Sequence, residues 1–191
     1  FWYVLLILSL LLGTSMIVYA DSSSPFGVHV VRQQAVLVGP EGGQMGTAEF
    51  WNTRNNLVVS LQADEEWKIK DSQIYAGEEI PPIKKNKDKP DFAKFPCKRA
   101  FAENHNSTMI LCSLKDELGH KWGGDQTRYT AIHVDLVQYS DLGELIETDA
   151  WVLPAEQIEF TDLAWGGYFT TKFAHPRRGH FIDSPVSGLT Y

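Results

Sequence analysis

Apolar and polar residues alternate with a period of two along residues 46–77. This alternation is typical of strands that bury one face in a core. An Asn-rich polar turn at residues 52–56 separates two such segments, which predicts a β-hairpin. Two further short strands are predicted at about residues 67–69 and 73–76.

The pattern continues after residue 100 and predicts an all-β protein. The strands expected there are residues 109–113, 128–138, 148–153 and 163–173. Residues 28–31 and 35–38 are expected to form a short hairpin or an edge strand, and residues 140–146 at most a short helix. Short strands at regular spacing predict an antiparallel β-sandwich, immunoglobulin-like or jelly-roll-like, with long loops.

Two long loops are expected, at residues 78–95 and 114–126. Three prolines in the first loop are incompatible with a central strand: Pro81, Pro82 and Pro90. Lys84 and Lys85 begin a basic run there, which is usually a solvated surface and could also contact an acidic partner. Trp122 precedes two glycines in the second loop and is the aromatic residue best placed for ligand binding.

The N-terminal segment, residues 1–20, is predicted to be a signal peptide outside the fold. Its apolar core is short, and Val18 and Ala20 are small residues at the positions that signal peptidase accepts before Asp21. A retained membrane anchor is the alternative, although Gly13 and the two residues after it interrupt the apolar run. We interpret the chain as lacking its first few residues, because no Met or basic residue precedes this run.

The charge of the chain makes some binding partners unfavourable, and its length limits the number of domains. Every charged residue follows Ala20, and the formal net charge is −7. This charge disfavours binding to nucleic acid or to an anionic membrane surface, so membrane contact is expected only through the signal segment or a missing C-terminal anchor. We expect a leader with the first edge strands at residues 21–45, one sandwich domain at 46–176, and a linker at 177–191.

Two cysteines, Cys97 and Cys112, are the only ones in the chain. In an exported protein they can form one disulfide that closes a modest loop, which stabilises by about 3 kcal/mol in the chain-entropy model. Two buried free thiols are the alternative. A zinc site of thiolate ligands is excluded because it needs more cysteines.

His133 and Asp135 are the residues that could carry chemistry. Their spacing on one strand directs both side chains to the same face. The two side chains could be two ligands of a metal ion, or a His-Asp pair that orients a nucleophile. The sequence shows neither further metal ligands nor a nucleophile elbow. A hydrogen-bonded structural histidine is the simpler interpretation, and no cofactor is expected. The acidic clusters, residues 64–66 and Glu144 with Glu147, are interpreted as solvated.

Five segments then occur in a recognisable order: GTAEFWNTRNNLVVSLQADEEWKIKDSQIYAG, IPPIKKNKDKPDFAKFPCK, YTAIHVDLV, TDAW and WGGYF. Together they resemble a β-sandwich module of bacterial exported and cell-surface proteins, over residues 46–173. Cys97 stands where that module commonly has Tyr, and Asp135 where it has a small residue. Residues 183–191, DSPVSGLTY, are similar to the start of a surface-protein repeat, so we expect a downstream repeat that is cut short.

The resemblance implies no catalytic activity, and therefore no catalytic residue. We expect a non-enzymatic module of an exported, cell-surface protein that acts in adhesion, display or as a spacer, with a glycan or a protein as partner. A carbohydrate-binding module attached to a secreted enzyme is the alternative. A hydrolase is a third and more distant interpretation.

Processing of the N-terminus provides a direct test of export. The mature chain is expected to begin at Asp21, because residues 18–20 match a signal peptidase site. N-terminal sequencing of the exported protein checks this expectation. Recovery of protein that still carries residues 1–20 would show a retained anchor instead.

Overall fold

The computed structural model describes residues 32–84, 90–120, 126–140, 142–154, 158–159 and 166–173. The signal segment with Ala20 and Asp21, and the linker at 177–191, lie outside these ranges. The described strands are β1 Gln33–Val38, β2 Gln44–Asn52, β3 Asn56–Ala63, β4 Lys68–Gly77, β5 Cys97–His105, β6 Ser107–Ser113, β7 Gln126–Tyr139, β8 Leu145–Leu153, β9 Ile158–Glu159 and β10 Gly167–Phe173.

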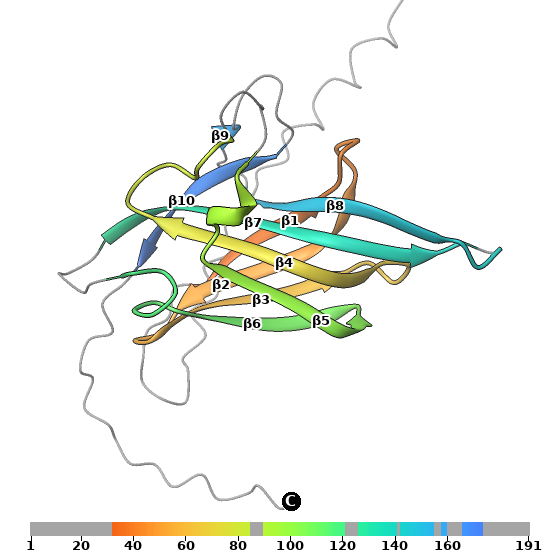
Figure 1. Cartoon of the computed structure of the whole chain (residues 1–191), viewed down its shortest axis with the longest axis horizontal. Coiled ribbons are helices and arrows are strands. Elements are labelled where there is room, and N and C mark those ends of the chain that lie inside the picture. The colour runs from red at the N-terminus through yellow and green to blue at the C-terminus, as the bar shows by residue number, and fades with distance from the viewer. Residues whose placement is uncertain are drawn as a thin grey trace, which may run out of the picture.

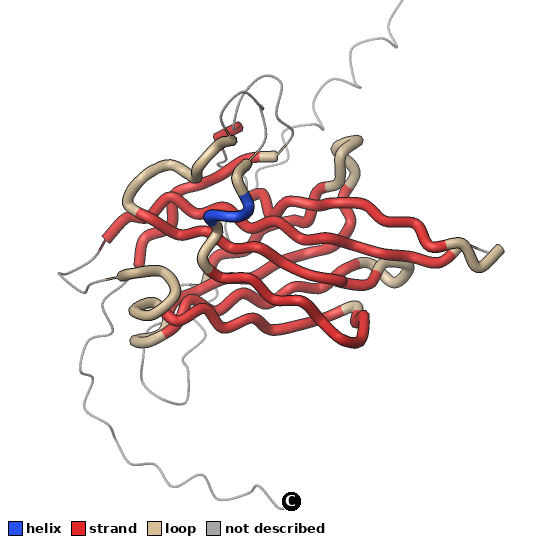
Figure 2. Tube along the Cα trace, in the orientation of Figure 1, coloured by secondary structure: helices blue, strands red, loops and turns tan. Residues whose placement is uncertain are grey.

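The strands form one antiparallel sheet that rolls over on itself (Figures 1 and 2), which confirms the predicted all-β antiparallel fold. Its order is β5-β4-β7-β8-β1-β2-β3-β6. β1 has β2 on one side and the last residues of β8 on the other, so it joins the two halves of the sheet. The predicted hairpin is β2–β3, which pairs from Asn52↔Leu57 to Gly46↔Ala63.

The two halves of the sheet enclose the main core. Leu57, Leu61, Ile132 and Leu136 are fully buried there, as their alternation predicts. Phe50 on β2 meets Phe169 on β10 across this core, with ring centroids 4.9 Å apart. Burial of these apolar side chains is the main stabilising contribution to the fold.

β4 is one strand where two were predicted, because its alternation changes phase at Lys70. Ile69, at an odd-numbered position, faces the core. Ser72 and Ile74 also face the core, although their positions are even-numbered. The register with β7 shifts between Ile69 and Asp71, so Lys70 is the extra residue of a β-bulge. The bulge keeps one continuous strand while moving Asp71 to the outer face, opposite Asp135.

Two further expectations are corrected. Residues 140–146 were expected to form at most a short helix, but residues 140 and 142–144 lie between β7 and β8, and residues 145–146 begin β8. β5 was not predicted, because its charged residues and few β-branched residues hide the alternation of an edge strand. The helix in the described part of the chain is the 3-10 turn η1 Phe92–Lys94, and no helix there is long and apolar enough to cross a membrane.

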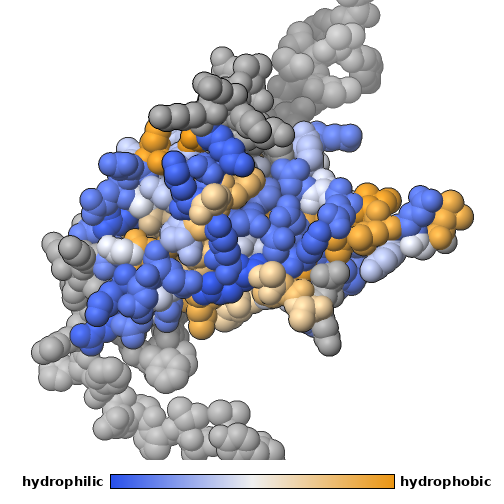
Figure 3. Space-filling view, in the orientation of Figure 1, coloured by the Kyte–Doolittle hydropathy of each residue, from blue (hydrophilic) through white to orange (hydrophobic). Residues whose placement is uncertain are grey.

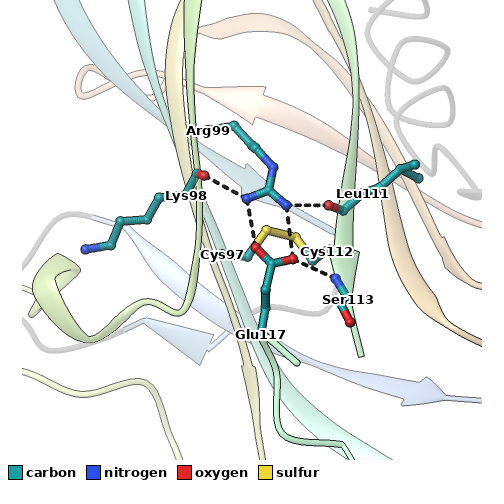
Figure 4. The surroundings of a disulfide bond; sticks show 7 residues. All are labelled: Cys97, Lys98, Arg99, Leu111, Cys112, Ser113 and Glu117. Atoms are coloured by element: carbon teal, nitrogen blue, oxygen red, sulfur yellow. Dashed lines mark hydrogen bonds and ion pairs between the residues drawn. A yellow bond between two sulfur atoms is a disulfide. The ribbon is translucent and has the colours of Figure 1, made fainter. Parts of the chain in front are cut away.

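A disulfide joins the two ends of the strand order, as Figure 4 shows. Cys97 on β5 and Cys112 on β6 are bonded, with their Cα atoms 5.7 Å apart, which confirms the predicted bridge. Both residues are fully buried in the main core. The bridge therefore fixes together two strands that pair with β4 and β3 rather than with each other.

A partly buried ion pair reinforces the same junction (Figure 4). The Arg99 guanidinium on β5 contacts both carboxylate oxygens of Glu117, at 2.8 and 3.0 Å, and donates to the carbonyl of Leu111 on β6. Glu117 also accepts the backbone N–H of Ser113. The hydrogen bonds from Arg99 are the main cause of a lowered pKa for Glu117, although burial opposes it. We call the disulfide with this ion pair the β5–β6 clasp.

Removing the bridge should measure its contribution to stability. Cys97→Ala with Cys112→Ala is expected to lower the free energy of unfolding by about 3 kcal/mol, because the unfolded chain gains entropy. Denaturant unfolding of both proteins, with and without reductant, provides the measurement. Reductant should destabilise the natural chain and leave the double variant unchanged. An equal response of both proteins would contradict this account.

Candidate functional site

The two long loops leave the same end of the sheet. β4 ends at Gly77, opposite Tyr129 near the start of β7, and β6 ends at Ser113, beside the first residue of β3. The loops that follow Gly77 and Ser113 therefore begin close to each other, as Figure 1 shows. This proximity depends on the sheet topology, which the sequence pattern did not specify.

Arg128 connects the two loops. Its Nη1 lies 2.7 Å from the Glu78 carboxylate in the first loop. Its Nε and Nη2 lie 3.3 and 3.1 Å from Nδ1 of His120 in the second loop. The Arg128 side chain is 6% exposed and the Glu78 side chain 79%, so the link runs from a buried guanidinium to the surface. Beside it is a hollow of about 340 Å³ between the loops, lined by Gly77, Glu78, Leu118, Gly119 and Arg128.

The charge of Arg128 affects its histidine neighbour. Burial lowers the pKa of His120, and the Arg128 guanidinium lowers it further, while Glu78 acts in the opposite direction. A neutral His120 can accept the Arg128 N–H at Nδ1. The pair therefore favours a neutral imidazole and a fixed geometry between the loops.

The predicted binding residues belong to these loops. Lys84 is exposed in the first loop, after the short bridge that pairs Ile83 with Pro90. Lys85 and Trp122 lie outside the described residues.

A second polar site lies on the outer face of the sheet. Three aspartates occupy directly opposed positions on adjacent strands: Asp71 on β4, Asp135 on β7 and Asp149 on β8. The neighbouring row holds Gln73 and His133. We call these five residues the acidic face. Side chains in directly opposed positions are roughly 5 Å apart at Cβ, so their charges interact strongly.

Gln73 organises the acidic face through both ends of its amide. Its Nε2 donates to Asp71, and to Asp135 at 3.3 Å. Its Oε1 accepts from Nδ1 of His133. The Nε2 atom of His133 then faces Asp149 at 3.5 Å and Asp135 at 4.0 Å. His133 and Asp135 thus share one face, and the imidazole joins a network of amide and carboxylate groups.

Aromatic rings cover His133 from solvent. The Phe92 ring, carried by η1 in the first loop, lies over the imidazole with centroids 4.3 Å apart. Trp151 makes an edge contact at 4.9 Å. Phe92 also packs on Phe95, which with Trp151 and Ala131 forms a second apolar cluster outside the main core. The first loop therefore folds onto the sheet instead of being wholly solvated.

Gly166 packs closely against Trp151 of this second cluster. Its φ is +109°, and a Cβ at this position would lie 2.4 Å from the Trp151 ring. Both the backbone conformation and the lack of space require glycine. The first glycine of the WGGYF segment is thus explained by its backbone conformation and packing, while Trp165 lies outside the described residues.

Burial and the neighbouring Asp135 raise the pKa of Asp71 from 3.8 to about 6. Burial is the main cause, followed by the hydrogen bond and the negative charge of Asp135, whereas the Gln73 amide and His133 oppose the shift. Two close carboxylates share a proton more readily than both ionise. Within the described ranges, no group of three or more His, Cys, Asp or Glu residues is arranged to hold a metal ion.

The acidic face was only partly visible in the sequence. The i, i+2 spacing indicated His133 and Asp135, but Asp71, Gln73 and Asp149 lie on other strands. A strand register was needed to bring them together, and the bulge at Lys70 made the register of β4 unpredictable. The Arg128 link between the loops was missed for the same reason.

Comparisons with known proteins give no match. No protein-family model matches the chain, and neither curated protein sequences nor solved structures match it significantly.

The raised pKa of Asp71 predicts a stability that falls as the pH rises. The folded protein holds the proton more tightly than the unfolded chain, so stability decreases from about pH 4 and the loss is complete above about pH 6. Asp71→Asn should keep the Gln73 hydrogen bond and raise the stability at pH 7 by about 1 kcal/mol, after allowance for solvent screening.

Unfolding free energies measured between pH 4 and pH 7.5 check this expectation. The difference between Asp71→Asn and the natural chain should grow across the interval. Asp64→Asn, at an exposed position in the β3–β4 turn, is the control and should track the natural chain. A constant difference at every pH would contradict the raised pKa.

Proposed function

We propose that the chain is a non-enzymatic binding module of an exported, cell-surface protein, and that it acts in adhesion or display. The observation that carries the proposal is the β5–β6 clasp, whose disulfide requires an oxidising compartment to form and persist. The resemblance over residues 46–173 to a module of bacterial surface proteins points the same way.

The loop end is the surface we assign to binding. Loops held in place by a rigid sheet are the usual recognition elements of β-rich modules. The β5–β6 clasp and the Arg128 link fix where both loops begin, and Lys84 remains exposed on the first. The partner is a glycan or protein that presents acidic groups to Lys84 and Lys85.

The surroundings of His133 support the absence of catalysis. Its hydrogen-bond, ion-pair and ring contacts among the described residues are the Gln73 amide, two carboxylates and two aromatic rings. None of these groups is a Ser or Cys nucleophile, and the disulfide occupies both cysteines. The histidine side chain is 5% exposed, which limits its access to a substrate.

Charge reversal at the loop end tests the proposal. Lys84→Glu with Lys85→Glu should weaken adhesion to a glycan or protein array by several-fold, because the basic run would repel an acidic partner. Trp122→Ala should also weaken adhesion if this residue contacts the partner. Both variants should retain the thermal stability of the natural chain.

A control variant and a hydrolysis assay decide the outcome. Gln62→Glu adds negative charge at the far end of β3 and should leave adhesion unchanged. Equal loss of adhesion in this control would place the binding surface elsewhere. Hydrolysis of a glycan or peptide panel that disappears with His133→Ala would overturn the non-enzymatic assignment.

A further inference from the structure

The β7–β8 hairpin extends beyond the rest of the sheet, at the end opposite the two loops (Figure 1). β4 pairs with β7 only as far as Val137, and β1 pairs with β8 only from Trp151 onward. Between these points β7 and β8 pair with each other, up to Tyr139 opposite Leu145. The end of the hairpin is therefore a two-stranded ribbon, which by itself is marginally stable in water.

This hairpin end carries a concentration of exposed apolar side chains, seen as the orange tip in Figure 3. The exposed fractions are 87% for Leu142, 67% for Tyr139, 50% for Leu145 and 41% for Ile146. Tyr139 and Leu145 are directly opposed and share the outer face of the sheet, whereas Ile146 belongs to the other face. Exposed apolar side chains that gather at one end of a sheet are typical of an interaction site.

The hairpin has a defined turn and is not a frayed end. Ser140 N–H donates to the carbonyl of Glu144 at 2.9 Å, and Gly143 N–H donates to the carbonyl of Ser140 at 2.8 Å. Gly143 adopts a φ of +78°, which glycine permits without strain. Backbone hydrogen bonds therefore close the turn between β7 and β8.

One edge of β8 is available for strand pairing. Residues 145–148 pair with β7 on one side, and no described strand pairs with them on the other. Proteins usually protect such edges with charges, prolines or bulges. The single charged residue of this stretch is Glu147, and both of its carboxylate oxygens lie 2.9 Å from the Lys70 ammonium. Lys70 thus neutralises Glu147 within the chain. This edge of β8 therefore has no net charge that would keep another strand from pairing with it.

We propose that the β8 edge pairs with β8 of a second copy of this chain, in an antiparallel dimer with two-fold symmetry. An open edge pairs with an extended strand, and the exposed part of β8 offers one that begins with two apolar residues and has no net charge once Lys70 is counted. The dimer would cover Leu145 and Ile146, and the tip of each hairpin would reach the end of β1 in the other copy. This inference does not depend on the proposed function.

Side-chain alternation selects the register. A two-fold axis perpendicular to the sheet places residues of equal parity opposite each other. A register centred on Ile146 puts Ile146 beside its counterpart and Leu145 opposite Glu147 of the second copy. A register centred on Glu147 would oppose two glutamates, which is destabilising. Of these two registers, the Ile146-centred one is therefore favoured.

The oligomeric state of the purified full chain tests the dimer. Sedimentation and light scattering across about 1 μM to 1 mM, the range of weak to moderate associations, should show a reversible monomer–dimer equilibrium. Ile146→Lys should weaken dimerisation at least tenfold, because it places two like charges together. Met109→Lys replaces an apolar residue that is 62% exposed on β6, and should dimerise like the natural chain.

Cross-linking tests the register even if a charged variant folds poorly. Ile146→Cys should form a covalent dimer under mild oxidation, since directly opposed residues place their Cβ atoms within disulfide reach. Met109→Cys, on another face, should stay monomeric. The inference would be overturned by a natural chain that remains monomeric throughout, by a dimer that survives Ile146→Lys, or by failure of Ile146→Cys to cross-link.

Discussion

The β5–β6 clasp is the constraint on which the rest of the structure depends. β5 and β6 are the two ends of the strand order, and each pairs with its inner neighbour rather than with the other. The disulfide, together with Arg99 and Glu117, joins these ends, so the rolled sheet keeps its core closed. Because β5 follows the first long loop and β6 precedes the second, the same clasp also fixes the positions of both loops.

A single bulge governs the outer face. Lys70 is the extra residue in β4, and it changes which side chains face outward from there on. Asp71 and Gln73 thereby join His133 and Asp135, and Lys70 itself reaches Glu147 on β8. A β4 without the bulge would present the opposite side chains to the outer face and bury others. The bulge at Lys70 therefore accounts both for the acidic face and for the ion pair that neutralises Glu147 on β8.

The two ends of the molecule differ in physical character. At the loop end, charged groups are paired and partly buried, as the Arg128 link shows. At the hairpin end, large apolar side chains are exposed on a regular ribbon with an open edge. Polar loops recognise a partner through directed contacts, whereas an apolar edge favours strand pairing. The separation would allow a dimer to present two loop ends at once.

The sequence by itself determined the class of fold and several of its elements. Period-two alternation revealed β3 and β7, because alternate residues of each strand line the main core. The two cysteines predicted their bridge once the chain was interpreted as exported. Tertiary structure decided the rest. β5 has too little apolar alternation to be visible, and the phase change at Lys70 made one strand look like two. The acidic face, the Arg128 link and the shared end of the loops depend on strand order and register, which arise from pairing between distant segments and leave no local pattern.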